Sequence, residues 1–132
     1  MPTAADVTGL PWSTAIDPDD GQTTDATPTT IATIATTTDK GHALDLTVGA
    51  AKDDRSVGVT FKILAHVSNV AGVCTVRNQA IFASDGRDPL EPTVLWDVEI
   101  DVSGTHIRVR VTGAAATTID WSVAGTMLIH GS

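Results

Sequence analysis

The apolar residues of this chain recur at every second position over most of its length. The clearest runs are Val94–Val102 and Ile107–Val111. Successive side chains of a β-strand point to opposite faces, so each run predicts a strand with one buried face. Ser103 and Gly104 between them are a tight-turn signal. The two runs are therefore expected to form a β-hairpin.

One register of this hairpin matches apolar with apolar and acid with base. Closing the turn at Ser103-Gly104 predicts the pairs Ile100–Ile107, Val98–Val109, Trp96–Val111, Asp101–His106, Glu99–Arg108 and Asp97–Arg110. A slip by one residue would turn the apolar set to water. Cross-strand ion pairs also explain the acidic row better than general acid–base chemistry does.

Five further segments carry the same alternation. They are residues 30–36, 42–49, 57–67, 73–82 and 119–129, and the last restarts across Gly125, a candidate bulge. A turn at residues 69–72 predicts the pairs Val67–Cys74, Ala65–Val76 and Phe61–Ala80. Seven or eight short strands without a convincing helix predict an all-β fold. We expect an antiparallel, jelly-roll-like β-sandwich over residues 23–132.

Residues 1–22 differ from the rest because prolines punctuate them and they contain few large apolar side chains. This segment is too irregular for an ordinary loop, so we predict an extended N-terminal arm. Such an arm either docks on a neighbour or is a disordered leader. If it docks, its assembly contacts are Leu10, Trp12 and Ile16.

Composition narrows the class of function. The 132 residues carry a formal net charge of -8, with a pI of about 4.6. An acidic surface argues against a nucleic-acid partner, since phosphates require Lys and Arg. No apolar run is long enough to span a membrane and no secretion signal is visible, so synthesis in a cytoplasm is expected. The single cysteine, Cys74, is predicted to be a small buried residue beside Val76, Ala80 and Phe82.

No catalytic, cofactor or metal motif is found, and we expect no enzymatic activity. The four histidines fall on separate segments without a metal-ligand spacing. Residues 17–21 hint at a calcium loop, but the later Glu is missing and Pro18 constrains the turn. Trp96 and Trp121 occupy inward positions and are predicted to belong to the core. A glycan platform would need them on an outer face.

Three stretches resemble small β-domains in virion proteins of tailed bacteriophages. These are residues 23–31 (TTDATPTTI), 102–109 (VSGTHIRV) and 111–121 (VTGAAATTIDW), and the similarity covers about residues 23–129. The matching residues are turn and strand patterns, so no binding residue is carried over.

The resemblance implies a virion accessory protein. We expect a non-enzymatic structural protein that decorates the capsid, contacts the major capsid protein or other virion proteins, and forms a homo-oligomer. A homotrimer is what the resemblance suggests. The alternatives are a tail-fibre or baseplate module and a carbohydrate-binding adsorption module.

Overall fold

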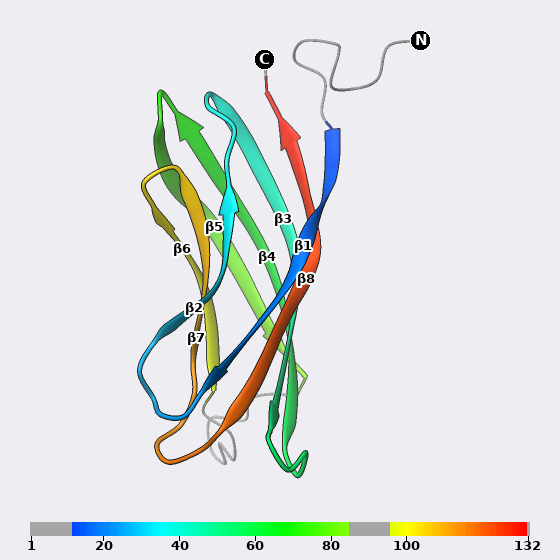
Figure 1. The fold of residues 1–132 in the computed structure, drawn as a ribbon. Helices are drawn as coiled ribbons and strands as arrows, with labels where there is room; N and C mark the ends of the chain where they lie inside the picture. The colour runs from blue at the N-terminus through cyan, green and yellow to red at the C-terminus, as the bar shows by residue number, and fades with distance from the viewer. Residues whose placement is uncertain (1–11, 85–95, 132) are drawn as a thin grey trace.

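The computed structural model describes residues 12–84 and 96–131, which form eight β-strands (Figure 1). The strands are β1 (Trp12–Thr23), β2 (Thr29–Ala35), β3 (Lys40–Lys52), β4 (Gly58–Val70), β5 (Val73–Ala83), β6 (Asp97–Ser103), β7 (His106–Thr112) and β8 (Ile119–His130). No helix long and apolar enough to cross a membrane is found among these residues.

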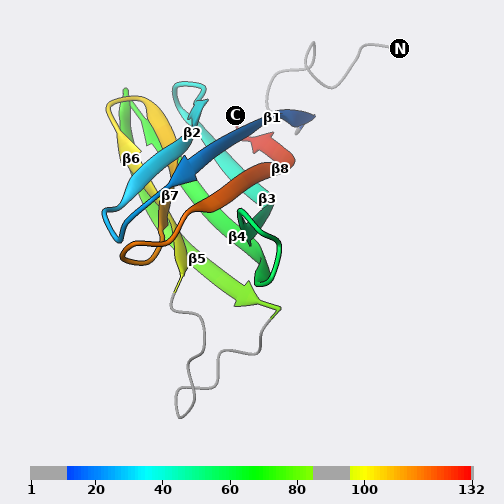
Figure 2. The same cartoon turned by 60° about the horizontal axis from the view of Figure 1, so that its bottom comes forward.

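The strands form two antiparallel sheets packed face to face, which confirms the predicted β-sandwich. The large sheet has the order β1-β8-β3-β4-β5 and the small sheet has the order β2-β7-β6. The first strand pairs with the last and the second with the seventh, a nesting shared with jelly rolls. The small sheet lies across one face of the large sheet (Figure 2). The opposite face of the large sheet is not covered by any described element.

The core lies between the sheets and follows the predicted alternation. In β3 the buried apolar side chains are Leu44, Leu46, Val48 and Ala50, and in β4 they continue at every second position from Val59 to Val67. Trp96 and Trp121 are buried, as predicted, with ring centroids 6.2 Å apart. Burying one such large apolar side chain stabilises the fold by about 1.5–3 kcal/mol.

The β6–β7 hairpin forms, but its predicted register is wrong by two residues. Its pairs are Val98–Val111, Glu99–Arg110, Ile100–Val109, Asp101–Arg108 and Val102–Ile107. The turn is Gly104-Thr105 because Gly104 adopts a φ of 60°, which suits the first central position of a type II′ turn. A shift by two residues leaves every side chain on its predicted face.

The β4–β5 hairpin also differs from its predicted register. Its turn is Ala71-Gly72, and Arg77 is an extra residue in β5 between the pairs His66–Asn78 and Val67–Val76. Because of this bulge, the side chains of β5 beyond Arg77 point to the opposite face of the sheet from the one predicted. Cys74 is buried as predicted, whereas Ala80 and Phe82 lie on the outer face and not beside it.

The bulge predicted at Gly125 is absent, since the pairing of β8 with β3 is continuous. The bulge lies instead in the neighbouring β1, where Asp17 and Pro18 face Ala124. Proline has no N–H for the ladder, so an edge-strand bulge accommodates it. Gly125 has another role: a Cβ there would come within 2.9 Å of the Leu46 Cα, so glycine permits close approach of two backbones.

The predicted arm of residues 1–22 is in part a strand of the sandwich. Trp12–Thr23 pairs along its length with β8 and forms one edge of the large sheet. The predicted boundary at residue 22 therefore falls inside β1. Residues 1–11 lie outside the described part of the chain.

Candidate functional site

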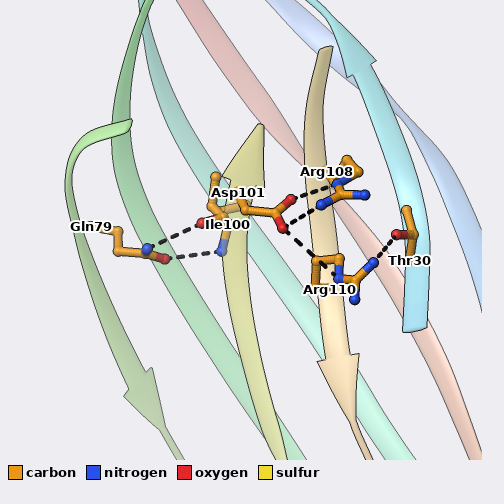
Figure 3. A network of polar contacts seen from close by, with 6 residues as sticks. All are labelled: Thr30, Gln79, Ile100, Asp101, Arg108 and Arg110. Carbon is orange, nitrogen blue, oxygen red and sulfur yellow. Dashed lines mark hydrogen bonds and ion pairs between the residues drawn. The ribbon is translucent and has the colours of Figure 1, made fainter. Parts of the chain in front are cut away.

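Asp101 of the acidic row in β6 forms ion pairs on the outer face of the small sheet (Figure 3). Arg108 donates two hydrogen bonds to the Asp101 carboxylate, at 2.7 and 2.6 Å. Arg110 lies 3.9 Å from the same carboxylate and donates to the Thr30 hydroxyl at 3.0 Å. The bond to Asp101 raises the pKa of Arg108. Asp101 therefore has cross-strand basic partners, Arg108 and Arg110, and not His106 as predicted. In the observed register Glu99 lies opposite Arg110, and Asp97 lies opposite Thr112 instead of the predicted Arg110.

One side of the sandwich is bridged by a side chain. Gln79 of β5 donates to the carbonyl oxygen of Ile100 and accepts from its N–H, at 3.1 and 3.0 Å (Figure 3). β5 and β6 are edge strands of different sheets. The Gln79 amide thus links the two sheet edges and satisfies both backbone groups of one residue.

A buried polar network lies at the end of the sandwich that holds the β4–β5 turn. Asn69 is buried and donates to the Thr36 hydroxyl at 2.9 Å. That hydroxyl lies 3.3 Å from the Cys74 Sγ and donates to the Thr105 carbonyl oxygen at 2.6 Å. Asn69 also accepts from the Gly72 N–H at 2.9 Å. The network joins both sheets and fixes the turn.

His42 belongs to the same end and is fully buried. Its Nε2 accepts from the Thr37 N–H at 2.9 Å, so the proton of the neutral ring is on Nδ1, which donates to the Val67 carbonyl oxygen at 3.1 Å. Burial lowers the pKa of His42; the Val67 bond opposes this effect, while the nearby His130 and His66 reinforce it. The neutral ring is a structural link between strands.

The tip of the β4–β5 hairpin is apolar and rigidly held. Val70 and Val73 flank the turn and are 58% and 66% exposed. Ala71 and Gly72 both have positive φ, and the Ala71 N–H donates to Asp39 Oδ1 at 2.7 Å. A non-glycine residue in this region is strained. The surrounding hydrogen bonds hold the strained turn in place.

Two histidines from separate segments come together on the outer face of the large sheet. The ring centroids of His66 and His130 are 5.1 Å apart. Both rings lean over Gly41, where a Cβ would lie 2.6 Å from the His130 Cε1. Two imidazoles alone do not complete a zinc site.

Across the described residues, no group of three or more His, Cys, Asp or Glu side chains could hold a metal ion. Asp17–Gly21, the candidate calcium loop, is part of strand β1.

Two carboxyl groups have lowered pKa values. Hydrogen bonds from Arg55 and then Gln22 hold the pKa of Asp120 below its usual range. Hydrogen bonds from Ser56 lower the pKa of Asp54.

The three predicted assembly contacts have different positions. Ile16 is buried in the core at 8% exposure, against its own chain. Trp12 is the first residue of β1, and its backbone pairs with Ile129. Leu10 lies outside the described residues. Contact of these residues with a partner stays a prediction.

An open groove of about 480 Å³ crosses the outer face of the large sheet. It is lined by Ser13, Ala43, Asp45, Leu64, His66, Asn78, Ala80, Thr126 and Leu128, among others. The small side chains of Ala43 and Ala80 leave hollows beside Leu64 and Leu128, which are 44% and 41% exposed. We call this feature the outer groove. It is the candidate interaction surface of the domain.

Two of the three resembling stretches meet inside the fold. The Trp121 Nε1 donates to the Thr23 hydroxyl at 2.9 Å in a buried bond between residues 98 positions apart. Gly113 packs tightly here, since a Cβ would lie 2.6 Å from the Thr23 Oγ1. These residues are structural, as expected of turn and strand patterns.

The sequence reasoning missed His42, Asn69 and Gln79. A signal existed for two of them, because His42 is in phase with the buried Leu44, and Asn69 is in phase with Val67. A polar residue at an inward position of a strand must find a hydrogen-bond partner. No such signal marks Gln79, whose facing depends on the bulge at Arg77.

No protein family matches the chain, and no curated protein matches it. Among solved structures, the chain is similar to the tailspike protein of Acinetobacter baumannii phage AM24, with a TM-score of 0.45 and 11% sequence identity. The match covers 91% of this chain and 26% of the tailspike chain. The chain thus spans about a quarter of that protein's chain. At this similarity the match says nothing of the function.

Proposed function

We propose that the chain is a non-enzymatic structural protein of a tailed-phage virion and that it decorates the capsid. The observation that carries the proposal is the resemblance of residues 23–31, 102–109 and 111–121 to small β-domains of such virion proteins. The chain would bind the major capsid protein or another virion protein, and it would associate with further copies of itself.

The architecture supports a role in which the domain holds a shape. The two sheets bury an apolar core, and Gln79, Asn69 and Thr23 make hydrogen bonds between distant segments. The bonds of Asn69 and Thr23 fix one arrangement of the strands, because both side chains are buried and breaking the bonds leaves polar groups without partners. A rigid domain with an uncovered sheet face suits attachment to a larger assembly.

The absence of enzymatic activity is part of the proposal. Two of the three acids singled out in β6 are engaged in structure: Asp101 binds Arg108, and Asp97 accepts from the Val98 N–H at 2.9 Å. We expect no stoichiometric zinc or calcium in purified protein and no turnover of polysaccharide or peptide. Metal analysis and an assay for reducing sugar released from host envelope test these points. A stoichiometric metal or sustained release would contradict them.

A tail-fibre or baseplate module is the same class of protein at another location. A carbohydrate-binding adsorption module is the more distant alternative, because sugar platforms use exposed aromatic rings. Of the described aromatic side chains, Trp96, Trp121 and Phe61 are buried, and Phe82 is exposed. This distribution favours the structural role.

Quantitative mass spectrometry of purified virions tests the proposal directly. Virions of the phage that encodes the chain would be separated into heads and tails, and the copy number of the chain would be measured in each fraction. A decoration protein is expected in the head fraction at a copy number comparable to that of the major capsid protein. A few copies in the tail fraction would favour the fibre or baseplate role. Absence from virions would refute both.

A further inference from the structure

The outer groove exposes apolar surface on a face that no described element covers. Leu128 pairs with the small Ala43 of β3, and Leu64 pairs with the small Ala80 of β5; both leucines are partly exposed. Exposed apolar surface rimmed by polar groups marks an interaction site more often than a solvated face. The hollow shape suits an extended segment with apolar side chains.

The charges restrict what can enter this groove. Its carboxylate, Asp45, forms an ion pair with Lys62 at 2.5 Å, so the groove presents no uncompensated acid. The chain has a net charge of -8, and two copies would repel each other over most of their surfaces. Residues 1–11 contain one charged side chain, Asp6, together with the apolar Val7 and Leu10. This segment can approach a second copy at little electrostatic cost.

The position of β1, the strand that follows residues 1–11, bears on which copy of the chain these residues can reach. Trp12 pairs with Ile129, and the next residue, Ser13, pairs with Leu128 at the groove. Strand β1, which follows the segment, therefore begins beside the groove. Pro11 disfavours a helical conformation at Leu10, which suits an extended segment. Eleven residues span at most about 40 Å, long enough to cross the face of a neighbour.

We propose that the outer groove receives residues 1–11 of a second copy of this chain, with Val7 and Leu10 as the apolar contacts. The groove lies next to the exit of the segment, so copies placed side by side can exchange their segments reciprocally in a closed assembly. This inference develops the self-association part of the proposed function. Its test uses purified protein, so its failure leaves the virion assignment untouched.

Sedimentation velocity over a wide range of concentrations tests the exchange. The full chain is expected to associate reversibly, and three variants are expected to raise the dissociation constant about tenfold or more: deletion of residues 1–11, Val7→Ser with Leu10→Ser, and Leu64→Ser with Leu128→Ser. Val73→Ser is the matched control, because Val73 is exposed but lies at the β4–β5 tip. This control should associate as the unmodified chain does, and all variants should keep the same circular dichroism.

Combining the deletion with Leu64→Ser and Leu128→Ser provides a further check. If the segment and the groove bind each other, the combined variant loses no more affinity than the deletion alone. A full chain that is monomeric at every concentration would overturn the proposal. So would a deletion variant, or a groove variant, that associates as tightly as the full chain. A monomer whose deletion increases binding of a hydrophobic dye would show that the groove holds its own segment, which also rejects the second copy.

Discussion

The Gln79 side chain makes the hydrogen bonds to Ile100 that a neighbouring strand would make at the open edge of β6. Its amide donates to the Ile100 carbonyl oxygen and accepts from the Ile100 N–H, so it occupies both hydrogen-bonding groups that β6 presents there. An open edge is a site where strands from other chains can pair. The bond pair closes this edge locally and ties it to the large sheet.

Gln79→Glu keeps the shape and the acceptor of this side chain but removes its donor. The carbonyl oxygen of Ile100 then faces a carboxylate, and the free energy of unfolding should fall by about 1–3 kcal/mol. Urea denaturation measures the change. Asn78→Asp makes the same chemical change at the neighbouring position, which does not bridge the sheets, and should cost less than about 0.5 kcal/mol. Equal effects of the two substitutions would contradict the bridging role.

Thr23→Val removes the buried hydroxyl that accepts from Trp121 while keeping the shape of the side chain. The indole N–H is left without a partner, and the expected loss of stability is about 1–3 kcal/mol. Thermal and urea unfolding, followed by tryptophan fluorescence, measure it. Thr23→Ser retains the hydroxyl and should recover most of the loss. A Thr23→Val protein as stable as the unmodified chain would show that this bond is dispensable.

Ile100→Ala should destabilise the domain by about 2–5 kcal/mol, because Ile100 is 2% exposed and its removal leaves a cavity between the sheets. The backbone bonds to Gln79 are retained in this variant, so the measurement isolates the packing contribution. Glu99→Ala, at the adjacent exposed position of β6, is the control and should change stability by about 0.5 kcal/mol or less. Chemical denaturation of both variants provides the comparison.

Stability should depend on pH through His42. Its folded-state pKa is lowered from 6.5, chiefly by burial, so the unfolded chain binds more protons in this range. The contribution of the neutral His42 ring to the free energy of unfolding is fully present above pH 6.5. It is lost as the pH falls toward the folded-state pKa of His42. The free energy of unfolding should therefore decrease as the pH falls below about 6.5.

His42→Gln should lower stability at pH 7, because the Thr37 and Val67 bonds are disturbed, and it should flatten this slope. His106→Gln, at an exposed position, should leave the slope unchanged. Urea denaturation at a series of pH values tests both variants. A His42→Gln protein that retains the full pH dependence would contradict the assignment of that dependence to His42.

The fold class and the buried face of most strands could be predicted from the sequence, because apolar residues alternate with polar ones along each strand. The inward positions of β3, β4, β6, β7 and β8 follow from it, and so does the burial of Trp96 and Trp121. The exact residue pairing between neighbouring strands could not be predicted from the sequence. In β6–β7 a shift by two residues satisfies both faces equally well, and the conformation of Gly104 selects between the registers.

By itself, then, the sequence determined an antiparallel sandwich with a specified inner surface, since burial of apolar side chains is a local pattern repeated along each strand. The tertiary structure decided what depends on distant partners: that residues 12–22 form an edge strand on β8, that the bulge at Arg77 turns Ala80 and Phe82 outward, and that Gln79 meets Ile100. These features arise where one strand meets another, and their hydrogen bonds join residues that no local pattern relates.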